Sequence, residues 1–110
     1  MVGKKYRLNL GRIRMRDFRQ VFRGKYLLVK NRQNGLSYAR LGVLVSRRAS
    51  LKATERNRLK RMIFDFFGRH FIFFEKKAGY DWLISFLTST GEIFNNREIL
   101  YKELDYVLHL

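Results

Sequence analysis

The densest binding chemistry of this 110-residue chain lies in one short segment, which contains Arg56, Asn57, Arg58, Lys60 and Arg61. Guanidinium groups bind phosphate oxygens in pairs, and an asparagine amide can donate to phosphate or accept from a ribose hydroxyl. A charged run on a helix is usually a solvated face, but such faces normally mix acidic and basic residues. Because this run has one sign, we predict a polyanion-binding surface.

Aromatic and basic residues are also interleaved between positions 14 and 23. Phe18 and Phe22 are four residues apart, and Arg19 and Arg23 follow them directly. This mixture suits single-stranded RNA, because rings stack on bases while the cations neutralise the backbone. From spacing alone two interpretations stay open: a stacking surface, or two rings that belong to the core.

Residues that could make the protein itself a nuclease are missing from the basic half of the chain. That half holds only two acids, Asp17 and Glu55, whereas a metal-dependent nuclease needs several converging carboxylates to hold Mg²⁺. We predict that both acids lie at helix starts and compensate the helix dipole. His70 and His109 have apolar or aromatic neighbours, which favours partly buried structural roles. The chain has no cysteine, and we expect it to bind no metal or cofactor.

The charge is distributed unevenly along the chain. Residues 1–61 contain 19 basic and 2 acidic residues, and residues 62–110 contain 5 basic and 7 acidic ones, for a net charge of +15. The asymmetry predicts one strongly positive surface, and nucleic acid is the commonest polyanion. No apolar run is long enough for a signal peptide or a membrane span. We therefore expect a cytoplasmic protein without a membrane partner, and we predict no protein oligomer.

The elements of the first half follow from hydrophobic spacing and turn residues. Residues 1–14 form a basic arm, either mobile or draped over the rest. We then predict a short helix over 15–23 that ends at Gly24, a strand over 26–30, a turn over 31–37, a returning strand over 38–46 and a basic loop over 47–54. The two strands are predicted to pair as an antiparallel hairpin.

The second half supplies the clearest helix and most of the core. At 100° per residue, the helix over 55–67 places Leu59, Met62, Ile63, Phe66 and Phe67 on one face. Residues 80–87 are apolar on both sides, which is typical of a central strand. A capping box of Asn95 and Glu98 begins a final helix that ends near Leu108. The conformation of residues 68–79 and the path of residues 49–54 stay open.

This element order predicts the fold class. It is an α+β fold of one domain over residues 1–110, a two-layer α/β sandwich of order α-β-β(-β)-α-β-α with helices on a small sheet.

Two segments of the chain resemble a known family. Residues 40–48, Arg-Leu-Gly-Val-Leu-Val-Ser-Arg-Arg, and residues 55–61, Glu-Arg-Asn-Arg-Leu-Lys-Arg, are similar to the signature of the bacterial ribonuclease P protein component. Residues 17–22 look like that family's first helix. The resemblance covers residues 12–67 well. Beyond them it rests on the opening of the strand at residue 80 and on the closing helix. It implies a mixed sheet with a left-handed βαβ crossover, an exception to the right-handed rule.

The function implied by the resemblance is that of a protein subunit in a ribonucleoprotein endoribonuclease, which removes the 5′ leader from precursor tRNA. In that family the RNA subunit carries the catalysis and requires Mg²⁺, so the isolated chain is not expected to be catalytic. Carried over by position, the contacts to the catalytic RNA are Arg47, Arg48, Arg56, Asn57, Arg58, Lys60 and Arg61. The leader contacts are Phe18, Phe22, Arg19 and Arg23, and either Tyr26 or Val29 lines the same cleft.

The chain departs from the family pattern in the loop 49–54, which lacks a glycine that many members have, and at Arg14 and Met15, where a serine or threonine cap is common. Two other functions compete with the family's. One is a structural RNA-binding protein of the ribosomal type, with no role in cleavage. The other is a basic module for acidic proteins or anionic membranes. It has less support, because the basic helix offers no large apolar face to a membrane.

Overall fold

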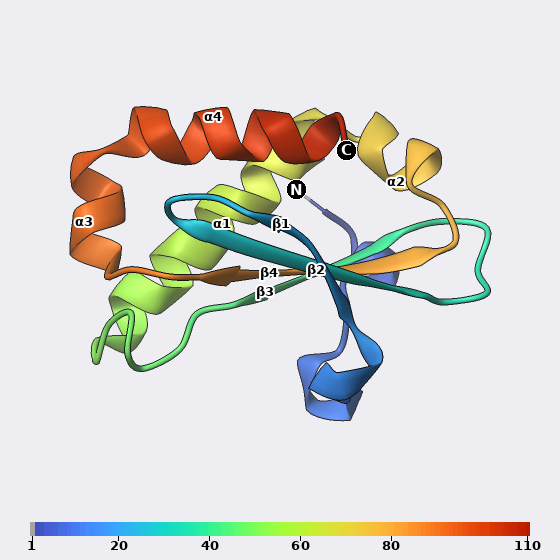
Figure 1. Ribbon diagram of the computed structural model, residues 1–110, viewed down its shortest axis with the longest axis horizontal. Coiled ribbons are helices and arrows are strands. Elements are labelled where there is room, and N and C mark those ends of the chain that lie inside the picture. Colours follow the sequence, from blue (N-terminus) through green and yellow to red (C-terminus); the bar gives the residue numbers. More distant parts are fainter. Residues whose placement is uncertain (1) are drawn as a thin grey trace.

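A four-stranded mixed sheet forms the centre of the computed structural model, which describes residues 2–110. The strands are β1 (Arg19–Arg23), β2 (Leu27–Gln33), β3 (Arg40–Leu44) and β4 (Tyr80–Phe86), in the spatial order β1-β2-β4-β3. Strand β2 is antiparallel to both β1 and β4, whereas β3 and β4 are parallel. The parallel pair needs a long crossover, and Figure 1 shows the helical segment that provides it.

Within residues 2–110, four α-helices accompany the sheet: α1 (Ala53–Arg69), α2 (Ile72–Lys76), α3 (Thr90–Asn95) and α4 (Arg97–Leu108). Side chains alternate between the two faces of each strand. Val43 and Ile84 join a core with Ile63 of α1 and Leu104 of α4, whereas Leu83 points to the opposite face. The predicted two-layer α+β arrangement is confirmed. None of the helices in residues 2–110 has the length and apolar composition needed to cross a membrane.

The N-terminal segment is draped over the sheet, one of the two alternatives open for the basic arm. Val2 and Leu8 are buried, and the Leu8 amide donates to the carbonyl of Leu41 at 2.9 Å. A side chain at Gly42 would not fit under this segment, because its Cβ would lie 2.9 Å from Leu10. Leu8 and Leu10 thus cover part of the sheet face that carries no helix, whereas Val2 and Tyr6 pack with the core on the helix side, so the segment passes along the β3 edge of the sheet (Figure 1).

The helix predicted over 15–23 is wrong. A 3₁₀ turn, Met15–Asp17, is followed by strand β1, whose backbone pairs with β2. The pairing shifts by one residue between Gln20 and Phe22, and such a bulge sends the next side chain to the other face. The four-residue spacing of Phe18 and Phe22, which suggested a helix, is therefore also compatible with a bulged strand. Gly24 caps no helix; it belongs to the turn between β1 and β2, where its amide donates to Leu27 at 2.8 Å.

The predicted hairpin of the strands 26–30 and 38–46 is also wrong, although both strands exist. Strand β4 lies between β2 and β3 and pairs with both. The apolar pattern of residues 80–87 indicated a central strand, and this prediction is confirmed: Asp81, Trp82, Leu83 and Ile84 are all buried. Because β4 separates them, β2 and β3 do not pair with each other and form no hairpin.

The helix predicted over 55–67 is confirmed and extends to Ala53–Arg69, with Leu59, Ile63, Phe66 and Phe67 buried and Met62 half-buried. The open segment 68–79 contains α2, whose Phe73 and Phe74 complete the core.

The predicted capping box is wrong. Asn95 ends α3, whose cap is Ser89, with a hydroxyl that accepts from the Glu92 amide at 3.2 Å. Helix α4 begins at Arg97 with no side-chain cap.

Candidate nucleic-acid interface

The outer face of α1 carries part of the basic run predicted to bind RNA. Asn57, Lys60 and Arg61 line a hollow of about 410 Å³. Residues three and four apart share a helix face, so these side chains follow one another along the same side of α1. The buried residues of α1 face the sheet on the opposite side.

Arg7 contributes to this hollow, although the sequence pointed to it only as part of a basic arm. Its guanidinium lies 4.5 Å from the ring centre of Phe64, and its Nε donates to the Val2 carbonyl at 3.1 Å. The draped N-terminal segment thus brings a fixed cation to α1. We name Arg7, Asn57, Lys60 and Arg61 the α1 surface.

The two arginines around Asn57 point elsewhere. Arg56 is half-buried, and its Nη1 donates to the Ser50 carbonyl at 2.8 Å. Arg58 stacks on Phe94, with 4.5 Å between the guanidinium carbon and the ring centre. The structure therefore does not bring the predicted RNA-binding residues of α1 onto a single face.

The loop before α1 is positioned by main-chain bonds at Ala49. Its amide donates to the Ser46 carbonyl, and its carbonyl accepts from the Thr90 amide at 2.9 Å. Arg47 and Arg48 are exposed beside it. These contacts define the path of the loop that the sequence left open.

Glu55 joins this loop and α3 to the first turn of α1. Its carboxylate accepts from the Thr90 hydroxyl at 2.7 Å and from the Ser50 hydroxyl at 3.1 Å. These two hydrogen bonds hold the pKa of Glu55 below its ordinary value. Glu55 lies in the first turn of its helix, as predicted. Asp17 does not lie at a helix start; it ends a 3₁₀ turn and lies 3.7 Å from Arg32.

The predicted leader-binding residues lie on and beside β1. Arg19 and Arg23 are exposed, Phe22 is half-buried against Tyr106 with ring centres 4.9 Å apart, and Phe18 is buried. Because of the bulge, Phe18 packs with Leu83 on the open face, whereas Phe22 packs on the core beneath the helices. The two rings therefore do not form one surface.

Tyr26 and Val29 do not line an open cleft. Both are fully buried in the core between the sheet and the helices, so neither alternative left by the resemblance fits.

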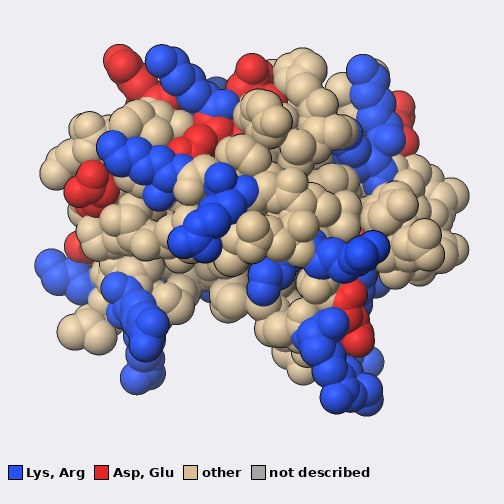
Figure 2. Space-filling model, in the orientation of Figure 1, with Lys and Arg blue, Asp and Glu red and all other residues tan. Residues whose placement is uncertain are grey.

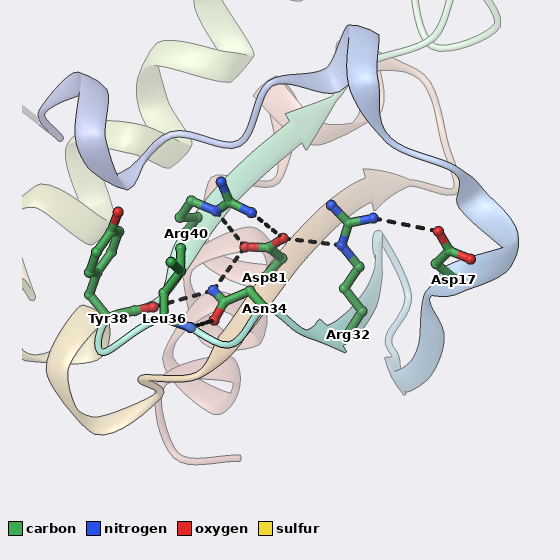
Figure 3. Close-up of polar contacts among 7 residues, drawn as sticks. All are labelled: Asp17, Arg32, Asn34, Leu36, Tyr38, Arg40 and Asp81. Atoms are coloured by element: carbon green, nitrogen blue, oxygen red, sulfur yellow. Dashed lines mark hydrogen bonds and ion pairs between the residues drawn. The ribbon is translucent and has the colours of Figure 1, made fainter.

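A cluster of charged side chains at the end of the sheet was missed by the sequence analysis (Figure 3). Asp81 is fully buried and accepts from Arg40 at 2.7 and 2.8 Å, from Asn34 at 3.0 Å and from Arg32 at 3.1 Å. Burial raises the pKa of Asp81, but the hydrogen bonds from Arg40, Asn34 and Arg32 outweigh it, so the pKa is lowered. We name Arg32, Asn34, Arg40 and Asp81 the Asp81 cluster.

The Asp81 cluster borders a hollow of about 940 Å³, which Asp17, Arg19, Asn31, Gln33 and Tyr80 also line. The only signal in the sequence was Asp81 at the start of an apolar strand, because a buried carboxylate needs hydrogen-bond partners.

Basic side chains are spread over the molecular surface. Figure 2 shows Lys and Arg across the whole view, whereas the acidic side chains lie mostly in its upper part, where Figure 1 places α4, with basic side chains beside them.

His70 and His109 are both exposed, contrary to the partly buried roles predicted for them. Within residues 2–110, no three His, Asp or Glu side chains lie close enough together to hold a metal ion.

The structure is thus an α+β protein with a mixed sheet, cations on the outer side of α1 and three arginines around a hollow at the end of the sheet. The chain belongs to the ribonuclease P protein family, whose model, described as Ribonuclease P, matches residues 13–109. It is 39% identical over 72 residues to the ribonuclease P protein component of Pseudomonas putida strain GB-1, and 42% identical over 66 residues to that of Thermotoga sp. strain RQ2. These alignments cover 66% and 54% of the chain, and 52% and 56% of the relatives. The chain thus spans about half the length of these relatives.

The fold also matches solved structures. The RNase P protein from Thermotoga maritima superposes with a TM-score of 0.71 at 31% identity, covering 89% of this chain and 94% of that one. A Staphylococcus aureus RNase P protein gives a TM-score of 0.62 at 24% identity, covering 89% and 94%, and supports the fold alone. Both agree with a mixed α+β architecture, whereas the crossover handedness remains an expectation from the resemblance.

Proposed function

We propose that this chain is the protein subunit of ribonuclease P. It binds the catalytic RNA, and it assists removal of the 5′ leader from precursor tRNA. The RNA subunit carries the catalytic Mg²⁺ ions, and the protein supplies cations and a shaped surface. The proposal rests on membership of the family together with the α1 surface, where three cations and an amide surround one hollow that also contains the carboxylate of Asp65.

The α1 surface suits a folded RNA because its cations are held in place. Arg7 is fixed by the Phe64 ring and by a main-chain carbonyl, and Lys60 and Arg61 project from a rigid helix. Guanidinium groups fixed in this way lose little conformational entropy on binding phosphate. Arg47, Arg48, Arg56 and Arg58 surround the same end of α1 and extend the positive field towards the RNA.

A paired substitution of Lys60 and Arg61 by alanine tests this surface. We expect weaker binding of the catalytic RNA, and a plot of log K against log salt that is flatter by about 0.7–0.9 for each phosphate that is no longer neutralised. A matched control, Lys76→Ala with Lys102→Ala, removes the same charge from exposed positions on α2 and α4. An equal weakening in both double variants would show a general charge effect and would refute the α1 surface.

The cleavage assay separates this function from that of a structural RNA-binding protein. The reconstituted complex should cleave precursor tRNA faster at low Mg²⁺ than the catalytic RNA alone. A chain that binds the RNA tightly but leaves the rate unchanged would fit the ribosomal-type alternative.

The second part of the proposal concerns the 5′ leader along β1. Arg19 and Arg23 neutralise its backbone, and the Phe22–Tyr106 ring pair offers an edge for stacking. Phe18 acts from the other face, where its ring supports the Arg32 guanidinium at 4.7 Å.

Phe22→Leu keeps apolar volume but removes a stacking ring. Binding of leader-bearing precursor tRNA should weaken by roughly 5- to 150-fold, while binding of mature tRNA stays nearly constant. Equal weakening for both substrates would mean that the ring serves only the core.

A further inference from the structure

We propose that Phe94 is a positioning residue for RNA binding, whose ring holds the guanidinium groups of Arg58 and Arg97 as a pair that binds the backbone of the catalytic RNA. This inference rests on the proposed function. It goes beyond that function because neither Phe94 nor Arg97 belongs to the basic run or to the residues that the resemblance assigns. It also gives Arg58, which lies outside the α1 surface, a place where it can act.

The ring of Phe94 lies at the corner where α3 ends and α4 begins. The guanidinium carbon of Arg58 is 4.5 Å from the ring centre, and that of Arg97 is 5.9 Å from it. Figure 1 shows α3 beside the N-terminal end of α1, so this one ring brings together a cation from α1 and a cation from α4. The ring is half-buried and packs on the core, which gives both cations a fixed support.

Contact with a ring leaves the hydrogen-bond donors of a guanidinium group available. A cation–π contact is electrostatic and does not occupy the five N–H donors with an acceptor atom. In the part of the chain that the structure describes, the guanidinium groups of Arg58 and Arg97 donate to no protein acceptor and form no ion pair. Both side chains are exposed. They can therefore bind a phosphate without first breaking a hydrogen bond within the protein.

The acids next to these two arginines in the sequence do not pair with them. Glu55 precedes Arg58 by one helical turn, and its carboxylate accepts from two hydroxyl groups instead. Glu98 follows Arg97 and lines the same hollow of about 530 Å³. It lies in the first turn of α4, where a carboxylate compensates the helix dipole. Because two like charges beside one ring repel each other, an anion that contacts both is a favourable ligand.

The support matters because a free arginine side chain samples many rotamers. A guanidinium group that is already held by a ring loses less freedom when it binds a phosphate. An exposed cation–π contact corresponds to a factor of about 2 to 5 in an equilibrium constant. Removing the ring should therefore lower the affinity for RNA without changing how many phosphates the protein neutralises.

A double-mutant cycle on binding of the catalytic RNA by the full chain tests this inference. Phe94→Leu keeps apolar volume but removes the ring, so the affinity should fall by about 2- to 5-fold. The slope of log K against log salt should stay the same, because no charge is lost. Phe94→Tyr keeps a ring and should restore the affinity. In a background with both Arg58→Gln and Arg97→Gln, Phe94→Leu should cause no further loss.

Arg97→Gln tests the new cation by itself. It should weaken binding and flatten the salt slope by about 0.7–0.9, as expected when one phosphate is no longer neutralised. Leu108→Ala is the matched control for stability, because it removes a half-buried apolar side chain at the other end of α4. It should leave the affinity for RNA unchanged. Urea unfolding checks that each variant is folded under the binding conditions.

The inference is overturned if Phe94→Leu weakens binding equally with and without the two arginines, because the ring then acts only through packing. A Phe94→Tyr variant that binds as weakly as Phe94→Leu has the same meaning. An unchanged salt slope for Arg97→Gln would show that Arg97 binds no phosphate, and this too overturns the pair.

Failure of the proposed function would give different results. A wild-type chain that binds the catalytic RNA without raising the cleavage rate would refute the role in cleavage. Wild-type affinity after substitution of Lys60 and Arg61 would refute the α1 surface. Neither result alters the coupling between Phe94 and the two arginines that the double-mutant cycle measures.

Discussion

At the residue scale, one buried carboxylate shapes the turn between β1 and β2. Glu103 projects from α4 and accepts from the amides of Lys25, Tyr26 and Leu27 at 3.0 to 3.2 Å. It also explains Gly24, because a Cβ there would lie 2.2 Å from the Glu103 carboxylate. Three main-chain donors, of which those of Tyr26 and Leu27 are buried, thus depend on one side chain.

Replacing Glu103 should therefore cost more than replacing a typical acidic residue. We expect Glu103→Ala to lower the free energy of unfolding by about 2–3 kcal/mol, because buried amides lose their acceptor. Asp105→Ala, an exposed position on the same helix, should change it by less than about 0.5 kcal/mol. Urea unfolding measures both, and similar values for the two variants would contradict this role.

Arg56 and Arg61 should differ in the same measurement, although both belong to the predicted RNA-binding run. Arg56 is half-buried and donates to the Ser50 carbonyl, so Arg56→Ala should cost about 1 kcal/mol. Arg61 is exposed, and Arg61→Ala should leave the unfolding midpoint nearly unchanged. A stable Arg56→Ala protein would show that the bond to the loop contributes little.

At the element scale, three segments meet at the N-terminus of α1. Glu55 connects the loop at Ser50 and the start of α3 at Thr90, and Arg58 adds a contact to Phe94 of α3. The basic end of α1 is therefore positioned by side-chain contacts from two other elements and not by the helix alone.

This junction should make stability sensitive to acid. The pKa of Glu55 is lowered in the folded state, so its contribution is present above the unfolded pKa and is lost as the pH falls through the folded pKa. We expect Glu55→Gln to be less stable than the wild type near about pH 6, and the difference to shrink towards about pH 3. Urea midpoints across this range test the effect, and a difference that is constant with pH would contradict it.

At the scale of the whole molecule, self-repulsion works against folding. A net charge of +15 on 110 residues raises the energy of the compact state. The Debye length is about 10 Å at 0.1 M salt, so added salt screens repulsion across the surface but affects the buried Asp81 pairs less. We expect the melting temperature to rise between about 20 and 200 mM NaCl. A fall over this range would mean that surface ion pairs outweigh the repulsion.

Local patterns alone predicted the elements whose surroundings are encoded in their own residues. The apolar face of α1 and the two-sided burial of β4 are properties of short segments, so their spacing was sufficient. The prediction of a polyanion-binding protein followed in the same way, because the basic motif around Asn57 and the shortage of acids in residues 1–61 can be recognised without the tertiary structure.

The segment 15–23 shows where local patterns fail. Its apolar spacing fits a helix, but its backbone finds partners on β2, and a bulge accounts for the spacing. The hairpin failed for a related reason: the strand between β2 and β3 comes from residue 80 onwards, and a pairing over such a distance leaves no signal in either strand.

The sequence by itself determined a basic α+β protein of the ribonuclease P family with a basic run on one helix. Only the tertiary structure decided which cations act together: Arg7 joins Lys60 and Arg61, while Arg32 and Arg40 meet at Asp81. Composition and residue spacing are properties of the sequence itself. These groupings depend instead on the burial of the Asp81 carboxylate and on the path of the N-terminal segment. Both are set by long-range packing of the whole chain.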